Sequence, residues 1–118
     1  MILEMHDNTT IEDLQEKFSG FYNHLKLDFY KGPHGRFESS DEKAAFSSDH
    51  RLGEIRRIHE QGEWEIHSGM KAGDLEQTFR KKYGLNVQVL VRAGSEWIQT
   101  TNADNLSLLE LNDLGKGE

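Results

Sequence analysis

The sequence contains no cysteine, which excludes disulfide bonds, thiol catalysis and zinc sites built on cysteine. It also lacks any apolar run close to the ~20 residues that a membrane-crossing helix needs. The first seven residues include acidic side chains where a secretory signal peptide would carry basic ones, and no apolar stretch follows them. These absences predict a cytoplasmic protein that has no membrane partner.

Basic residues are also scarce, because the 118-residue chain has 14 lysines and arginines against 21 aspartates and glutamates, a net charge of −7. Nucleic-acid binding relies on cations that neutralise phosphates, so this balance predicts no nucleic-acid partner. Such a partner would require six basic residues to gather on one surface, namely Arg36, Arg56, Arg57, Arg80, Lys81 and Lys82. Charged residues make up 30% of the chain and the mean hydropathy is −0.77, which predicts one domain with a small core.

The common catalytic motifs are absent as well. The sequence has no glycine-rich phosphate loop, no dinucleotide-binding fingerprint and no nucleophile elbow. Its 11 glycines are scattered at expected turns and helix ends. These absences favour a non-catalytic protein and give no reason to expect a cofactor.

The apolar pattern predicts eight elements in the order α-β-α-β-α-β-β-α. Helices are expected over residues 10–22, 48–61, 71–83 and between 102 and 115, and strands over residues 24–31, 63–67, 85–92 and 97–101. Thr9 and Glu12 have the spacing of a capping box, with Thr9 as the N-cap of the first helix. The strand from residue 85 to 92 is the strongest, because it is alternating, uninterrupted and rich in valine.

This order predicts an α+β fold with a single domain over residues 10–115. We expect a four-stranded mixed sheet with a C-terminal antiparallel hairpin and about four helices. Residues 1–9 are expected to form a flexible N-terminal arm, residues 32–47 a long mobile loop and residues 116–118 a tail.

The chain also contains an internal echo with an offset of 61 residues. Four residues of the first predicted helix recur in the third, since Asp13, Leu14, Phe18 and Tyr22 match Asp74, Leu75, Phe79 and Tyr83. Farther along, Phe37 aligns with Trp97, and the Leu52-Gly53 pair aligns with Leu114-Gly115. The echo fits two copies of a helix-strand-strand-helix unit, although any amphipathic helix before a strand produces similar matches.

The principal candidate for binding is the face of the predicted hairpin that carries Trp97. Alternation places Gln99 on the same face, and if Ile98 points inward, Trp97 points outward beside Leu90 or Arg92. An exposed tryptophan next to an arginine is typical of a binding hot spot. We therefore expect a non-catalytic protein-binding or self-assembling module, whose partner is another protein or a second copy in a homodimer. The alternative is that Trp97 packs under the last helix or the long loop.

A second candidate is a metal site on the predicted strand over residues 63–67. Glu63, Glu65 and His67 alternate onto one face, and His59 lies just before the strand. Carboxylates and imidazoles bind zinc or manganese, so the alternative function is a small metal-dependent or acid–base enzyme. Side chains two residues apart on a strand are separated by ~6.6 Å, so a solvated polar face explains the same pattern.

Four motifs resemble a set of small bacterial proteins of unknown function. They are Leu52-Gly53-Glu54-Ile55-Arg56, Asp74-Leu75-Glu76-Gln77 with Phe79, Tyr83-Gly84-Leu85-Asn86-Val87-Gln88-Val89, and Gly94 with Trp97, Thr100, Thr101 and Asp104. The similarity spans about residues 10 to 115. The resemblance implies a free-standing bacterial cytosolic domain, and it implies no activity, cofactor or site residue.

Overall fold

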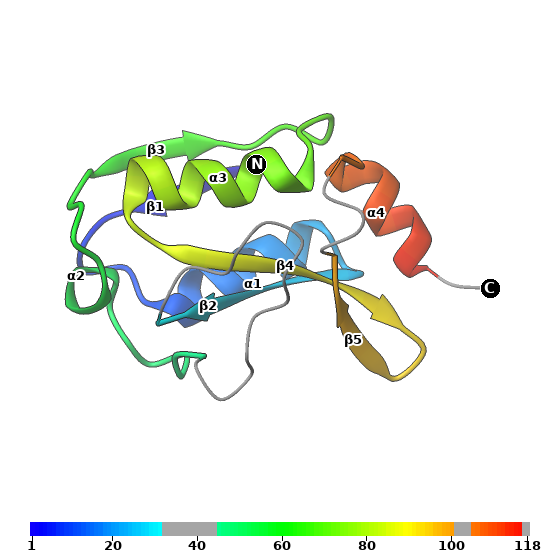
Figure 1. Ribbon diagram of the computed structural model, residues 1–118, viewed down its shortest axis with the longest axis horizontal. Coiled ribbons are helices and arrows are strands. Elements are labelled where there is room, and N and C mark those ends of the chain that lie inside the picture. The colour runs from blue at the N-terminus through cyan, green and yellow to red at the C-terminus, as the bar shows by residue number, and fades with distance from the viewer. Residues whose placement is uncertain (32–44, 101–104, 117–118) are drawn as a thin grey trace.

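The computed structural model describes residues 1–31, 45–100 and 105–116 (Figure 1). Over these ranges the chain has an α+β architecture, as the apolar pattern predicted. The strands are β1 (Ile2–Met5), β2 (Leu25–Tyr30), β3 (Gly62–Glu65), β4 (Asn86–Ala93) and β5 (Glu96–Gln99). The helices are α1 (Ile11–Phe21), α2 (Leu52–Ile55), α3 (Ala72–Tyr83) and α4 (Leu108–Gly115).

The strands form two antiparallel sheets in place of the predicted four-stranded mixed sheet. One sheet pairs β1 with β3, and the other has the order β2-β4-β5. Each strand pair in the described ranges is antiparallel. The prediction treated a helix between two strands as a crossover within one sheet, whereas α1 and α3 each lead from the two-stranded sheet to the three-stranded one.

Strand β1 replaces the flexible arm that the sequence led us to expect. Leu3 and Met5 are fully buried, and Leu3 lies opposite Trp64 of β3 in the antiparallel register. The terminal amino group also donates a hydrogen bond to the Ile66 carbonyl at 3.0 Å. The sequence did not predict β1 because four residues are too few to show a clear alternation of apolar and polar side chains. The strand is ordered by its pairing with β3.

The start of α1 lies one residue beyond the predicted position. Thr10 is the N-cap, and its Oγ1 accepts a hydrogen bond from the Asp13 backbone at 3.1 Å. The Asp13 carboxylate accepts one from the Thr10 backbone in return, also at 3.1 Å. The capping box therefore uses Thr10 and Asp13, and the predicted pair of Thr9 and Glu12 is wrong.

Helix α2 is a single turn, although the sequence predicted a helix over residues 48–61. The chain becomes extended at Arg56, with φ −125° and ψ 150°. This conformation brings the buried Arg56 side chain to Asp7, where Nη2 lies 2.8 Å from a carboxylate oxygen. The helix predicted from the spacing of Ile55 and Ile58 therefore ends early, where the chain turns to form the ion pair between Arg56 and Asp7.

Most of the predicted 32–47 loop, residues 32–44, lies outside the described residues, as do residues 117–118 of the predicted tail. At the end of that stretch, Ala45 forms a β-bridge with Tyr30. The Phe46 backbone donates to the Phe29 carbonyl at 2.7 Å, and the Phe46 side chain packs against the core. The last residues of the predicted loop therefore belong to the folded body.

Phe79 lies where the two sheets meet. Its ring makes edge-to-face contacts with Phe29 of β2, at 5.8 Å between centroids, and with Trp64 of β3, at 4.9 Å. Trp64 and Ile66 are both buried, which confirms the inward face predicted for this strand. The inner faces of β2 and β4 complete this part of the core with Leu25, Leu27, Val87, Val89 and Val91.

The two halves of the chain share one feature at the starts of their helices. Thr10 forms an isolated antiparallel bridge with Arg51, and Lys71 forms the same bridge with Ser107. These residues are the N-caps of α1 and α2 in the first half and of α3 and α4 in the second. Backbone hydrogen bonds of 2.8 to 3.0 Å flank both bridges. The two bridges are thus a structural similarity between the halves of the chain, in addition to the sequence matches at an offset of 61 residues.

The matching bridges show a different correspondence between the two halves of the chain beyond the first helices. Leu52 and Leu108 each follow the bridging N-cap, so these two leucines are structural counterparts. The predicted match of Leu52 with Leu114 is therefore wrong. The match of Phe37 with Trp97 involves a residue outside the described ranges.

Candidate functional site

The hairpin face predicted to bind a partner lies at one end of the molecule, near α4 (Figure 1). Trp97 lies opposite Arg92 and Gln99 opposite Leu90 in the antiparallel register, so the four side chains share one face of the sheet. Trp97 is 38% exposed and Arg92 is exposed, whereas Leu90 is 5% exposed and Gln99 is half-buried. The structure thus places the four residues together, with Leu90 beneath the others.

Lys26 of β2 extends this face, and sequence reasoning missed it. It lies opposite Leu90 across the β2–β4 pair. Its Nζ lies 5.9 Å from the centroid of the Trp97 ring and 3.7 Å from the Asp28 carboxylate. The sequence carries no signal for the β2–β4 register, so it could not place this lysine beside Trp97. We call the group of Lys26, Leu90, Arg92, Trp97 and Gln99 the Trp97 surface.

Ile98 projects from the opposite face of β5 and is 49% exposed. Ile98 pairs with Val91, so it lies on the sheet face that carries the buried valines of β4. It is nevertheless half exposed because the tip of the hairpin extends past the core, where Ala93 to Glu96 are exposed as well. Both faces of the hairpin tip are accessible, and Trp97 contributes the larger side chain.

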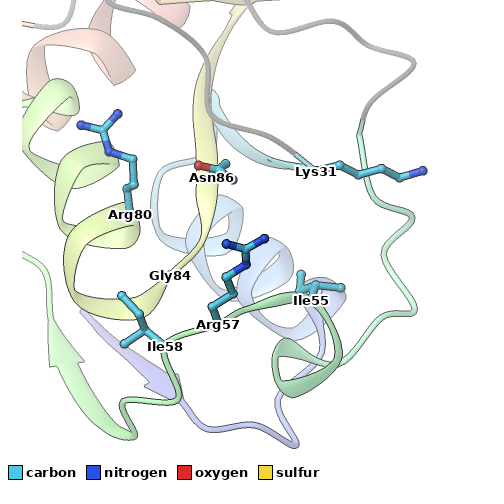
Figure 2. Close-up of a pocket in the computed structure, with 7 residues that line it drawn as sticks. All are labelled: Lys31, Ile55, Arg57, Ile58, Arg80, Gly84 and Asn86. Carbon is cyan, nitrogen blue, oxygen red and sulfur yellow. The ribbon is translucent and has the colours of Figure 1, made fainter.

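A basic pocket lies at the other end of β4, and the sequence analysis did not single it out (Figure 2). It is an open hollow on the surface with a volume of about 420 Å³. The lining residues come from four parts of the fold and are Lys31, Ile55, Arg57, Ile58, Arg80, Gly84 and Asn86. Within the described residues, the three cations form no ion pair. We call these seven residues the basic pocket.

The basic pocket lies beside the end of α2, which is shorter than α4, the helix that follows the matching N-cap bridge. Helix α4 has eight residues and reaches the turn between α1 and β2, where a Cβ placed on Gly115 would lie 2.6 Å from the His24 Cβ. Helix α2 has four residues and stops short of the turn between α3 and β4. The extended segment after Arg56 crosses that turn instead, with the Ile58 backbone against Gly84. The pocket lies at this point, lined by Ile55, Ile58 and Gly84.

An ion pair between the buried Arg56 and the partly exposed Asp7 supports the segment that forms this pocket. The Arg56 guanidinium donates to one Asp7 oxygen from Nε and Nη2, at 3.0 and 2.8 Å, and from Nη1 to the Tyr83 carbonyl at 3.4 Å. The other Asp7 oxygen lies 2.9 Å from His59 Nδ1. These bonds tie the segment 56–59 to the N-terminal part of the chain and to the end of α3.

The hydrogen bond from Arg56 lowers the pKa of Asp7 below its ordinary 3.8, and the bond from His59 acts in the same direction. A carboxylate whose pKa is depressed on folding stabilises the protein above its unfolded pKa, and this stabilisation disappears as the pH falls through the folded pKa. We therefore expect Asp7→Asn to lower the melting temperature at neutral pH and to flatten its decline below about pH 4. Melting curves from pH 2 to 7 measure both effects. Asp113→Asn, which removes only an exposed ion pair with Lys116, is the control, and equal pH profiles would refute the expectation.

The residues of the metal hypothesis do not converge. His59 pairs with Asp7, as described above. His67 and Glu65 are 3.9 Å apart and are both mostly exposed, while Glu63 lies opposite Glu4 of β1. Within residues 1–31, 45–100 and 105–116, no group of three or more histidine or carboxylate side chains could hold a metal ion. The metal hypothesis stays a prediction to which the described geometry adds no support.

Among the six basic residues named for nucleic-acid binding, only Arg57 and Arg80 line the basic pocket. Arg56 is buried in its ion pair, and Arg36 lies outside the described residues.

Every helix in the described part of the chain is too short or too polar to span a bilayer. No protein-family model, curated protein or solved structure matches this chain significantly.

Proposed function

We propose that this protein is a non-catalytic module that binds an acidic segment of a partner protein through the Trp97 surface. The observation that carries the proposal is the indole of Trp97, which is 38% exposed, has the Lys26 ammonium 5.9 Å from its centroid and lies opposite Arg92 in the strand register. Burying such a ring in a partner releases hydrophobic free energy that the isolated chain does not gain. Tryptophan and arginine are also among the residue types most enriched in interface hot spots.

The charges around Trp97 support an acidic partner. Arg92 faces Trp97 across the hairpin, and the Lys26 ammonium lies near the indole ring. Arg92 uses its Nε donor on the Gly94 carbonyl at 3.1 Å, and its terminal nitrogens have no partner among the described residues. Lys26 and Arg92, together with the Asp28 carboxylate beside Lys26, give this face a local charge of +1 on a chain of net charge −7, which would direct an acidic segment to it.

A second copy of this chain is the competing partner. Two molecules that each carry a net charge of −7 repel one another. A two-fold contact through the Trp97 surface would also bring the Lys26 and Arg92 side chains of both copies together. These charges favour a different, acidic protein over a homodimer.

We also infer that the chain arose by duplication of a strand-helix-strand-helix unit. The matching N-cap bridges of α1 with α2 and of α3 with α4 support this origin, as does the pairing of the counterparts β1 with β3 and β2 with β4. On this view the α4 end and the α2 end are equivalent positions that have diverged. One end carries the Trp97 surface and the other carries the basic pocket.

Selection from a random peptide display library tests the proposed function. Selection on the wild-type protein, with counter-selection on Trp97→Ala, is expected to enrich peptides that combine acidic and apolar residues. Calorimetric titration of an enriched peptide should show that Trp97→Ala weakens binding roughly tenfold or more, as for a hot-spot residue. Lys26→Glu and Arg92→Glu should also weaken it, and the wild-type affinity should fall with added salt.

Ile98→Ala is the matched control, because Ile98 lies on the opposite face of the same strand and is also exposed. This variant should bind the enriched peptide like the wild type. Enrichment of basic peptides, or equal losses for Ile98→Ala and Trp97→Ala, would contradict the proposal. Light scattering that shows a dimer which Trp97→Ala dissociates would assign the surface to self-assembly, and would also contradict it.

A further inference from the structure

We propose that the basic pocket is a second binding site, separate from the Trp97 surface, that takes a small molecule carrying a phosphoryl dianion. Asn86 belongs to the basic pocket and Arg92 to the Trp97 surface, and both lie on β4. They are six positions apart on the strand, a distance of ~20 Å. Figure 1 likewise places α2 and the β4–β5 hairpin at opposite ends of the molecule. One small ligand therefore cannot occupy both sites.

The cations of the basic pocket indicate the charge of the ligand. Figure 2 shows the Arg57 and Arg80 side chains on either side of Asn86, while Lys31 extends away from them at the rim. Arginine presents a planar set of donors that matches the oxygens of a phosphoryl group. Asn86 adds a neutral amide donor to the same lining. Two arginines, with a lysine at the rim and no acidic residue among the lining side chains, make this hollow positive on an acidic protein.

The apolar part of the lining indicates that the ligand also has an organic body. Ile55 and Ile58 line the same pocket, and Ile58 is 42% exposed. A site for inorganic phosphate alone gains nothing from these side chains, whereas an ester with an apolar group buries them. We therefore expect an organic phosphate to bind more tightly than the free anion.

The backbone that carries these side chains is held from two sides. Arg56, the neighbour of Arg57, is fixed by its ion pair with Asp7 and its bond to the Tyr83 carbonyl. Gly84 has a φ of +68° and approaches the Ile58 backbone so closely that a Cβ would lie 2.9 Å from its nitrogen. The pocket residues therefore rest on a segment that is positioned before any ligand arrives, which lowers the entropic cost of binding.

Titration with phenyl phosphate, inorganic phosphate and benzyl alcohol tests this proposal by calorimetry and by amide chemical shifts. Phenyl phosphate should bind saturably, with shifts at residues 57, 80 and 86 and none at Trp97. The double variant Arg57→Ala/Arg80→Ala should lose about tenfold or more in affinity, as expected for removal of charged hydrogen bonds. Lys81→Ala is the matched control, because Lys81 is an exposed cation on the same helix that does not line the pocket.

The arms of the titration also identify the source of the phosphoryl group. Tighter binding of phenyl phosphate than of inorganic phosphate supports an organic ester, and equal binding supports free phosphate at the same site. Binding of benzyl alcohol as tight as that of phenyl phosphate would overturn the proposal. An undiminished affinity in a double variant that melts like the wild type, or the absence of saturable binding at millimolar phenyl phosphate, would also overturn it.

Discussion

Truncation of Phe79 to alanine is expected to lower the free energy of unfolding by about 4 kcal/mol, the largest effect of any substitution considered for this protein. Phe79 is fully buried and contacts Phe29 of one sheet and Trp64 of the other. The substitution therefore opens a cavity at the junction of the two sheets, where neither backbone can collapse to fill it. Urea denaturation of the two proteins measures the difference.

Phe21→Ala is the control for this prediction, because Phe21 is 55% exposed at the end of α1. It should change the free energy of unfolding by less than about 1 kcal/mol. Similar losses at the two positions would mean that Phe79 is not the link between the sheets. The α+β arrangement described above would then need revision.

Truncation of Arg56 to alanine is expected to lower the free energy of unfolding by about 2 kcal/mol, as for the loss of a buried donor that leaves its acceptors unsatisfied. The Arg56 side chain is fully buried, and its removal takes the donor from one Asp7 oxygen and from the Tyr83 carbonyl, while the other Asp7 oxygen keeps its contact with His59. The segment that lines the basic pocket loses its attachment at the same time. Denaturation curves combined with phenyl phosphate titration should therefore show losses of both stability and binding.

The adjacent Arg57 provides the matched control. It is exposed, and it has no ion pair among the described residues. Arg57→Ala should leave the unfolding free energy within about 0.5 kcal/mol of the wild type while weakening phenyl phosphate binding. If Arg57→Ala destabilised the protein as much as Arg56→Ala, the division between a structural and a ligand-binding arginine would be wrong.

The α3–β4–β5 region could be predicted from the sequence because its signals are local. Phe79 and Tyr83 belong to a helical stripe, Gly84 ends the helix in the left-handed conformation, and the valines of β4 alternate without interruption. Propensity, capping and alternation agree there, so the predicted boundaries lie within a residue or two of the observed ones. Trp97 could be assigned to the hairpin face for the same reason.

The elements that the sequence did not predict depend on distant partners. β1 is ordered by its pairing with β3 across about half of the chain. The predicted second helix stops early because Arg56 turns toward Asp7, a residue 49 positions away. The basic pocket likewise unites Lys31, Arg57 and Arg80, which no sequence motif connects. Tertiary contacts decided all three features, and local patterns contain no information about them.

The proposed function would be tested most directly by mapping an enriched acidic peptide on the isotope-labelled protein. We expect the signals of the Trp97 indole N–H and of the amides of residues 26, 92 and 97 to shift on titration. The amide signals of residues 57, 80 and 86, in the basic pocket, should not shift. Because the pocket is also cationic, it serves as the internal comparison for charge alone. If only the pocket signals shift and the Trp97 indole signal does not, the peptide binds the basic pocket. This result would contradict the assignment of the hairpin as the binding face.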